Sequence, residues 1–480
     1  MLPARPRSGR RIHTGSFEYA PDGHMITQVS PDNTDVIHRD LNLTYPVIDR
    51  GDGIFLYDTE GKRYIDGSGG SAAVTAIGHG VPEVIEAMTA QAKRLAFAPT
   101  HAFTTEPIEE CARLIVEKFA PAGMARVFFC SSGSEANENA IKMAIQYHRE
   151  HGQPQKQIII SRWNSFHGLT MATLALSGHT GRRRKLVPAL PQSVHIPPCY
   201  RYRYADPRDE AYGVTAAMEL DRTIRNLGPE NVAAFIAEPV VGATLGAVPG
   251  ERTYFQRIRR ICDEHNILLI SDEVMTGFGR TGLAFGIDHW GEVPDLITCA
   301  KGIAGGYSPL GAVIARSEIV SEVRHRSGSF MIGGTASGNP LSCATAIAVM
   351  NYIVEHDLIS NSAEVGWYFL EQLKRLKRIH PIVGDVRGLG LLVGLEFVKD
   401  RKSKEPFPPE LGVAKRIASE TFERGLLSYP GQGTADGTKG DHIMYAPPLT
   451  ITKSQVDELI TILDESIAVA EAEFAEDFAP

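Results

Sequence analysis

The sequence has few cysteines, no long apolar run and no excess of basic residues, and each of these absences excludes a class of protein. Its six cysteines never form a CxxC pair, so neither a disulfide framework nor a zinc site is indicated, and no metal site is expected. No apolar stretch approaches the length of a membrane span, and the first residues, MLPARPRSGRR, lead into no hydrophobic core of a secretory signal. These absences favour a cytoplasmic protein that needs no membrane partner.

The charge of the chain is mildly acidic. Its 57 Asp and Glu residues outnumber its 49 Lys and Arg residues, which gives a formal net charge of -8 at pH 7. Such a chain has no electrostatic reason to bind nucleic acid or an anionic membrane surface. We therefore expect small-molecule partners and no nucleic acid.

The chain is long enough for more than one hydrophobic core. At 480 residues it exceeds the size at which a single core stops growing, so two packed domains are expected. The predicted division is a flexible N-terminal arm over residues 1–35, an N-terminal part of the small domain over 36–70, a large domain over 71–340 and a C-terminal small domain over 341–480.

The large domain is predicted to hold a mostly parallel sheet. Short β-prone runs alternate there with helical patterns, such as the apolar spacing from Tyr254 to Cys262. This alternation is typical of an α/β fold with helices on both faces of the sheet, which binds ligands at the carboxyl ends of its strands. The strand-like runs are MARVFFC, QIIIS, VAAFIAEP, ILLISDEV, DLITCA and GAVIAR.

The small domain is predicted to be α+β. A helical pattern covers Leu341–His356, the strand-like run GLLVGLEFV follows, and an amphipathic helix is expected after Thr452. Near the N-terminus, IFLYDTEGKRYIDG is typical of a hairpin that turns at Glu60 and Gly61.

The stretch FFCSSGSEANENAIKMA indicates a strand, a turn and a helix that begins near Glu135. The free N–H groups of a helix start favour an anion, Gly133 allows close approach, and Ser134 offers a hydroxyl. A helix cap made by Ser132 or Ser134, with Glu138 in the first turn, explains the same residues without a ligand. From this stretch alone both interpretations stay open.

Two adjacent carboxylates, Asp272 and Glu273, end the apolar run ILLISDEV. Side chains alternate along a strand, so the two carboxylates are expected to point in opposite directions. A buried carboxylate needs a positive or proton-donating partner, and a protonated pyridine nitrogen is one candidate. A metal ion and a structural salt bridge are the alternatives.

Lys301 directly follows the run DLITCA and precedes three glycines. Desolvation at such a strand end would lower the pKa of its amine, and a neutral amine is the form that attacks a carbonyl. The alternative is an ordinary surface lysine.

Taken together, these stretches resemble the class III aminotransferases, the ornithine, 4-aminobutyrate and omega-amino-acid transaminase group of fold-type-I pyridoxal-phosphate enzymes. Lys301 lies 29 positions after Asp272, and the match extends over most of the chain from about residue 50. The other matching motifs are SGSEA at 132–136, SFHG at 165–168, AEP at 237–239, DEV at 272–274, GGTASGNP at 333–340 and APPLTIT at 446–452.

The resemblance implies roles for particular residues. Lys301 would hold pyridoxal 5'-phosphate as a Schiff base and then shuttle a proton, while Asp272 would keep the pyridine nitrogen protonated. Thr335 would reach the phosphate of the neighbouring subunit, which implies a homodimer with shared active sites. The other implied cofactor-binding residues are Gly133 and Ser134 at the phosphate, Val274 and Phe166 on the two faces of the ring, and Glu238 beside the ring and substrate.

This sequence departs from the family pattern at three places. Phe166 stands where the family usually has tyrosine, and the adjacent His167 is interpreted as structural. Met444 occupies the position of an arginine that binds the acceptor carboxylate in the ornithine and 4-aminobutyrate branch. The omega-transaminase branch has an arginine slightly upstream of GDHI, where this chain offers Lys439. A specialist for 2-oxoglutarate is therefore not expected.

The predicted function is transfer of an amino group from an amine or omega-amino acid to a 2-oxo acid, with pyruvate as the expected acceptor, by a ping-pong route through pyridoxamine phosphate. The alternatives are decarboxylation-coupled transamination, an amino-acid racemase, an aminomutase and a cofactor-binding regulator that catalyses nothing. The basic run from Arg182 to Lys185 is interpreted as a solvated loop without a site role.

Overall fold

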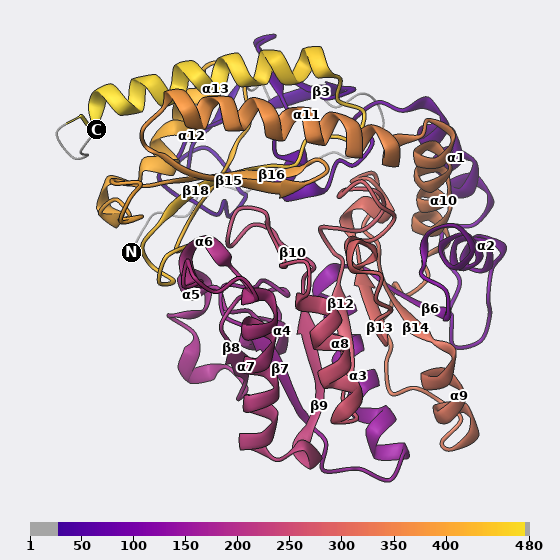
Figure 1. Ribbon diagram of the computed structural model, residues 1–480. Coiled ribbons are helices and arrows are strands. Elements are labelled where there is room, and N and C mark those ends of the chain that lie inside the picture. The colour runs from indigo at the N-terminus through magenta and orange to yellow at the C-terminus, as the bar shows by residue number, and fades with distance from the viewer. Residues whose placement is uncertain (1–26, 476–480) are drawn as a thin grey trace, which may run out of the picture. The chain divides into compact units, whose positions relative to one another are not determined.

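The computed structural model describes residues 27–475 (Figure 1). These residues fall into two compact units. One unit comprises residues 27–50 and 56–63, and the other comprises residues 51–55 and 64–475. Residues 1–26 of the predicted arm lie outside the described part of the chain. The short strands of the N-terminal region are β1 (Gln28–Val29), β2 (Tyr45–Pro46), β3 (Ile48–Asp52), β4 (Phe55–Asp58) and β5 (Arg63–Ile65).

The predicted turn at Glu60 and Gly61 is present. The Asp58 N–H donates to the Lys62 carbonyl at 3.1 Å, and Gly61 has a φ of 85°, a backbone conformation that glycine adopts without steric cost. The chain therefore reverses direction where the sequence places the hairpin.

A seven-stranded sheet forms the centre of the second unit. Its parallel pairs join β12 to β13, β12 to β9, β7 to β9 and β7 to β8, while β14 runs antiparallel to both of its neighbours. The predicted α/β fold with a mostly parallel sheet is confirmed, and all six predicted runs are strands of this sheet. Its strand order is β6 (Met124–Cys130), β14 (Gly311–Arg316), β13 (Leu296–Cys299), β12 (Leu268–Asp272), β9 (Val232–Ala237), β7 (Ile158–Arg162) and β8 (Val194–Ile196).

Helices cover both faces of this sheet because its strands are apolar on both sides. Leu268 and Ile270 of β12 share a core cluster with Ala140 of α3, whereas Leu269 belongs to the cluster that contains Ile258 of α8. Figure 1 shows α7 and α8 running beside the strands. The helices around the sheet are α3 (Gly133–Glu150), α4 (Met171–Leu176), α5 (Thr180–Arg183), α6 (Arg201–Tyr204), α7 (Tyr212–Leu227), α8 (Tyr254–Glu264) and α9 (Ser317–His325).

Several short strands and turns, and three further helices, complete this part of the chain. The pair β10 (Val240–Val241) and β11 (Val248–Pro249) is antiparallel. The helix predicted over Leu341–His356 is present as α10 and contacts both α1 and α2. The remaining segments are α1 (Pro82–Arg94), α2 (Glu106–Leu114), α10 (Pro340–Glu355), the π-helical turns Gly69–Ala73 and Ile115–Phe119, and the 3-10 turns Val187–Ala189, Pro229–Asn231, Gly286–Trp290, Lys301–Ile303 and Pro409–Leu411.

A four-stranded antiparallel sheet follows in the C-terminal part of the chain, where α11 and α12 pack on the sheet and α13 packs on these two helices (Figure 1). The last helix begins as predicted, because the Thr452 hydroxyl accepts from the Gln455 N–H and the Gln455 side chain returns a bond to the Thr452 N–H. The domain limits at residues 70 and 340 stay predictions. The elements are β15 (Val383–Leu389), β16 (Leu392–Phe397), β18 (Asp441–Tyr445) and β17 (Tyr429–Gln432) in sheet order, with α11 (Leu358–Ile379), α12 (Val413–Glu423) and α13 (Lys453–Glu473).

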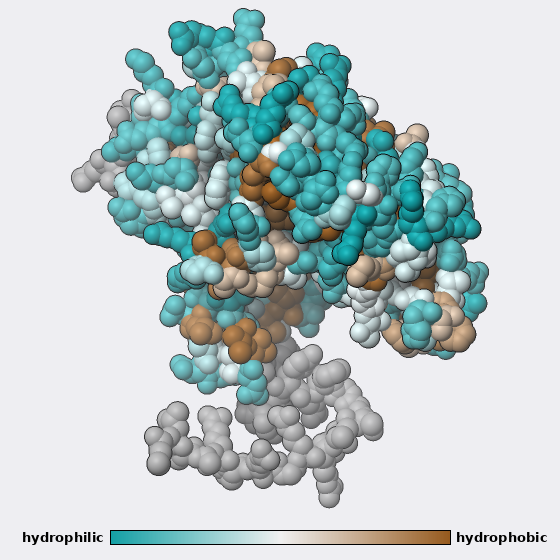
Figure 2. Space-filling view, turned by 90° about the horizontal axis from the view of Figure 1, so that it is seen from below, coloured by the Kyte–Doolittle hydropathy of each residue, from teal (hydrophilic) through white to brown (hydrophobic). Residues whose placement is uncertain are grey.

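Among residues 27–475, no helix has both the length and the apolar composition that crossing a bilayer requires. Figure 2 shows apolar clusters on a face that is otherwise largely hydrophilic.

Candidate active site

The predicted site residues follow the carboxyl ends of strands that run in one direction. Asp272 ends β12, Lys301 follows β13, Glu238 follows β9, and Phe166 lies four residues beyond β7. Strand β6 leads directly into the start of α3. Since parallel strands end at the same edge of a sheet, the fold assembles these residues at one edge, as the sequence predicts.

Asp272 is buried and held from several sides. One carboxylate oxygen, Oδ2, accepts from Asn137 Nδ2 at 2.8 Å and lies 2.7 Å from His167 Nδ1, while Oδ1 accepts from the Val274 N–H at 3.1 Å. A carboxylate oxygen accepts hydrogen bonds, so His167 Nδ1 is assigned as the donor in this contact. Asp272 thereby keeps a fixed orientation, and among the described residues it pairs with no arginine or lysine side chain.

Sequence reasoning missed Asn137 as a site residue and gave His167 no specific partner. Asn137 is fixed in turn, because its Oδ1 accepts from the Thr298 hydroxyl at 2.6 Å and its Nδ2 also donates to the His167 carbonyl at 2.7 Å. The available signal was the helical spacing that puts Asn137, one turn inside α3, on the buried side of that helix.

Glu273 points away from Asp272, as strand alternation predicts. Its carboxylate accepts from the N–H groups of Gly286 and Ile287 at 2.8 Å each, and from the Thr276 hydroxyl. Burial raises the pKa of Glu273 to about 7, which the three hydrogen bonds oppose. Glu273 therefore anchors the turn at Gly286–Trp290 and takes no part in the site.

Lys301 has the properties of a reactive amine. Burial lowers its pKa to about 8, the negative charge of Asp272 raises that pKa, and the positive charges of Arg182 and Arg280 lower it further. The backbone of Lys301 has a φ of 46°, a left-handed conformation that is strained for a residue with a side chain. Such strain, held in place by the surrounding structure, is common at functional positions.

The start of α3 provides a tight anion cradle. The Ser132 hydroxyl accepts from the Glu135 N–H at 3.2 Å, so Ser132 is the helix cap, as the alternative interpretation proposed. A Cβ added at Gly133 would lie 2.9 Å from both methyl carbons of Val274, so only glycine fits there. Ser134 accepts from the Leu169 N–H at 3.2 Å, which ties the cradle to the loop after β7.

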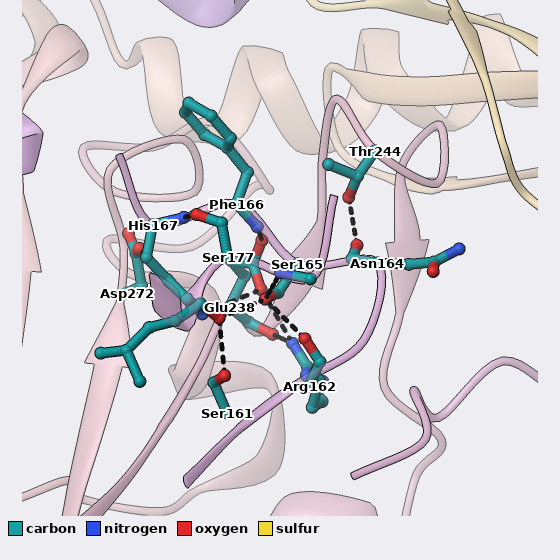
Figure 3. A network of polar contacts seen from close by, with 12 residues as sticks. Ser161, Arg162, Asn164, Ser165, Phe166, His167, Ser177, Glu238, Thr244 and Asp272 are labelled. Carbon is teal, nitrogen blue, oxygen red and sulfur yellow. Dashed lines mark hydrogen bonds and ion pairs between the residues drawn. The ribbon is translucent and has the colours of Figure 1, made fainter. Parts of the chain in front are cut away.

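That loop is held by a buried ion pair (Figure 3). Arg162 donates to the Glu238 backbone carbonyl at 2.5 Å and to its carboxylate at 3.2 Å, and the other carboxylate oxygen accepts from the Phe166 N–H at 2.9 Å. In Figure 3 the Phe166 ring points away from this polar network. Glu238 therefore fixes the backbone beside the ring that is predicted to stack on the cofactor.

Three other features that the sequence singled out can be located in the structure. Thr335 is exposed, and Met444 is fully buried in β18. The basic run is not a uniformly solvated loop: Arg184 and Lys185 are exposed, but Arg182 lies over the Phe166 ring, 4.6 Å from the ring centre. Arg182 and Arg183, which belong to the short helix α5, are only partly exposed, which the run of like charges did not reveal.

These residues fit pyridoxal phosphate. The cradle closed by Val274 would hold the phosphate at the start of α3, Asp272 would face the pyridine nitrogen, and the Lys301 amine would form the covalent link. The close approach that Gly133 allows, and a buried carboxylate oriented by His167 and Asn137 rather than by a cation, are the observations that match this cofactor.

The comparisons with known proteins agree with this geometry. The family model described as aminotransferase class-III matches residues 37–467. An uncharacterized aminotransferase of Bacillus subtilis, YodT, is 39% identical over 442 residues, which cover 92% of this chain and 99% of that protein. The putrescine–pyruvate aminotransferase of Pseudomonas aeruginosa is 39% identical over 429 residues, covering 88% and 91%.

The comparison with solved structures agrees with these sequence comparisons. The omega-transaminase of Pseudomonas jessenii, in complex with PMP, superposes with a TM-score of 0.86 at 31% identity and covers 92% of this chain and 97% of its own. The chain thus has the fold-type-I architecture of pyridoxal-phosphate-dependent transaminases. It belongs to the class III aminotransferase family and is a pyridoxal-phosphate-dependent aminotransferase.

Proposed function

We propose that this aminotransferase takes the amino group from an amine or omega-amino acid and transfers it to pyruvate by a ping-pong mechanism. The observation that carries the proposal is the pairing of a low-pKa lysine, Lys301, with a carboxylate, Asp272, that His167 and Asn137 orient. Relatives whose names specify putrescine–pyruvate and omega-transaminase activity support the choice of substrates.

Each of the two residues has a distinct task. When bound, pyridoxal phosphate supplies the carbonyl that accepts the amino group and the ring that stabilises negative charge on the substrate carbon. The Asp272 carboxylate holds a proton at the ring nitrogen, because its negative charge favours that proton. The Lys301 amine, once free, removes and returns the proton of the substrate carbon as a general base and acid.

The choice of pyruvate as the acceptor rests on the side chain of Met444 in β18. Met444 is buried there and offers no charge to a second carboxylate of the acceptor. Pyruvate has one carboxylate and 2-oxoglutarate has two, so this position supports the smaller acceptor.

We also propose that the protein is a homodimer with shared active sites and that it works in a reducing cytoplasm. Several apolar side chains are exposed on two segments that a hydrogen bond from Asn339 Nδ2 to the Ala96 carbonyl, at 3.4 Å, connects. Thr335 is exposed on the second of these segments, where a partner could use it. All six cysteines are buried and unpaired, which suits a reducing compartment. The exposed apolar residues are Leu95, Phe97, Phe103 and Met331.

A panel of donors and acceptors tests the proposed reaction. Holoenzyme is incubated with amines and omega-amino acids against pyruvate and 2-oxoglutarate, and the keto products and alanine or glutamate are quantified. Alanine formation from pyruvate at several times the rate of glutamate formation is expected. Release of carbon dioxide, inversion without amino transfer, or no turnover with any pair would contradict the proposal.

A further inference from the structure

A group that recognises a substrate carboxylate has to be sought elsewhere in this chain, because Met444 and Lys439 stand at the two positions where the related branches have an arginine. Met444 is apolar and buried, and Lys439 is exposed in the turn between β17 and β18. A carboxylate bound without a positive partner in a pocket that excludes water is costly.

Arg182 lies beside the cofactor-binding residues. Its guanidinium carbon is 4.6 Å from the centre of the Phe166 ring, and its Nη2 donates to the Tyr429 hydroxyl at 3.2 Å. Phe166 is adjacent in the chain to His167, which contacts Asp272. The charge of Arg182 also reaches Lys301, whose pKa it lowers.

Arg182 has no anionic partner among the described residues. Apart from the bond to Tyr429, its side chain donates to no described acceptor. Of the buried arginines nearby, Arg162 pairs with Glu238, whereas Arg280 is held through Nη1 by the backbone carbonyls of Leu391 and Pro447 and its Nη2 has no partner. Arg182 is thus a partly buried cation that retains free donors next to the reactive groups.

We propose that Arg182 binds the carboxylate of the substrate, so that the chain selects amino donors and 2-oxo acceptors that carry a carboxylate over uncharged ones of the same length. A guanidinium suits this task because its planar fork can donate two parallel hydrogen bonds to one carboxylate. Phe166 and Tyr429 orient that fork from two sides. The inference rests on the proposed function, whose substrate class it narrows.

The donor half-reaction tests this inference without a carboxylate acceptor in the mixture. β-Alanine and propylamine differ only in the carboxylate, and each is mixed with holoenzyme in single turnovers that are followed by the absorbance of the bound cofactor. Arg182→Gln is expected to lower the ratio of the β-alanine rate constant to the propylamine rate constant about ten- to a hundredfold, the value of a hydrogen bond to a charged group. Arg182→Lys keeps the charge and should give an intermediate ratio, whereas the exposed neighbour variant Arg184→Gln should keep the wild-type ratio.

A binding measurement separates recognition from catalysis. Calorimetry of holoenzyme with butyrate, which cannot react, and with the neutral butyramide should show that wild type prefers butyrate and that Arg182→Gln loses this preference. If Arg182→Gln slows both donors equally, or leaves both the rate ratio and the butyrate preference unchanged, Arg182 only packs on Phe166 and the inference is overturned. If wild type reacts with neither donor but binds butyrate through Arg182, the proposed function fails and the carboxylate site stands.

Discussion

At the scale of single residues, the two proposed catalytic residues, Lys301 and Asp272, have different surroundings. Lys301 is desolvated, so its amine loses its proton more easily than an exposed lysine does. Asp272 is oriented by hydrogen bonds to Asn137 and His167, and it has no arginine or lysine partner among the described residues.

The pKa of Lys301 predicts how cofactor attachment depends on pH. Its amine has a pKa of about 8 in the folded chain instead of the ordinary 10.5, so the neutral, attacking form becomes dominant above about pH 8. The rate of borohydride-trappable cofactor attachment to the cofactor-free protein should rise with pH and level off above about 9. Between the two pKa values only the unfolded chain keeps the proton, so the stability of the cofactor-free protein should rise with pH across that window. Attachment to another lysine, or a rate that does not change with pH, would refute the assignment, and Lys301→Ala is the control.

Asp272 and Glu273 form a matched pair of variants. Asp272→Asn removes the charge that is proposed to hold the ring proton, so turnover should fall at least about a hundredfold with little change in melting temperature. Glu273→Gln removes one acceptor from a buried turn and should lower the free energy of unfolding by about 1–3 kcal/mol while the folded fraction retains its turnover. Steady-state kinetics and thermal unfolding distinguish the two; if Asp272→Asn instead unfolds the protein and spares catalysis, Asp272 is structural.

At the scale of elements, the site depends on how closely the start of α3 approaches β12. Ser132 caps α3, Gly133 leaves room for Val274, and Val274 lies two residues after Asp272, the last residue of β12. The predicted positions of the cofactor's phosphate and of its pyridine nitrogen therefore both depend on the contact between Gly133 and Val274.

Gly133→Ala tests that contact. The added methyl carbon would lie 2.9 Å from the methyl carbons of Val274, and overpacking of this kind costs about 1–3 kcal/mol. The affinity for pyridoxal phosphate, measured by fluorescence titration, should fall about tenfold or more. The double variant Gly133→Ala with Val274→Ala should recover part of the loss because it restores the space. Unchanged affinity in the single variant would show that the cofactor does not use this cradle.

At the scale of the whole molecule, the proposed dimer would place Thr335 of one chain at the phosphate site of the other. Thr335→Ala removes one hydrogen bond to a charged group, so cofactor affinity should fall about ten- to a hundredfold while the dimer persists in sedimentation experiments.

Subunit exchange shows whether the sites are shared. In a heterodimer of Lys301→Ala and Thr335→Ala chains, one site regains both residues only if they come from different chains. Mixing the two inactive or weakened variants should therefore restore activity above that of either homodimer. No gain on mixing would place Thr335 in its own chain's site or outside it.

Local patterns in the sequence were enough to predict six of the seven strands of the large sheet, the start of α13 and the strand-end positions of Asp272 and Lys301. Strand and helix periods and helix caps depend on neighbours in the chain, so they can be read without the fold. The opposite directions of Asp272 and Glu273 also follow from strand geometry alone.

Only the tertiary structure decided what surrounds those residues. Asn137 and His167 meet Asp272 across 135 and 105 positions of sequence, and no local pattern encodes such a contact. Arg182 belongs to a basic run that is typical of a solvated loop, yet folding of α5 against the loop after β7 brings it over Phe166. The lowered pKa of Lys301 likewise arises from desolvation and from charges that long-range packing assembles.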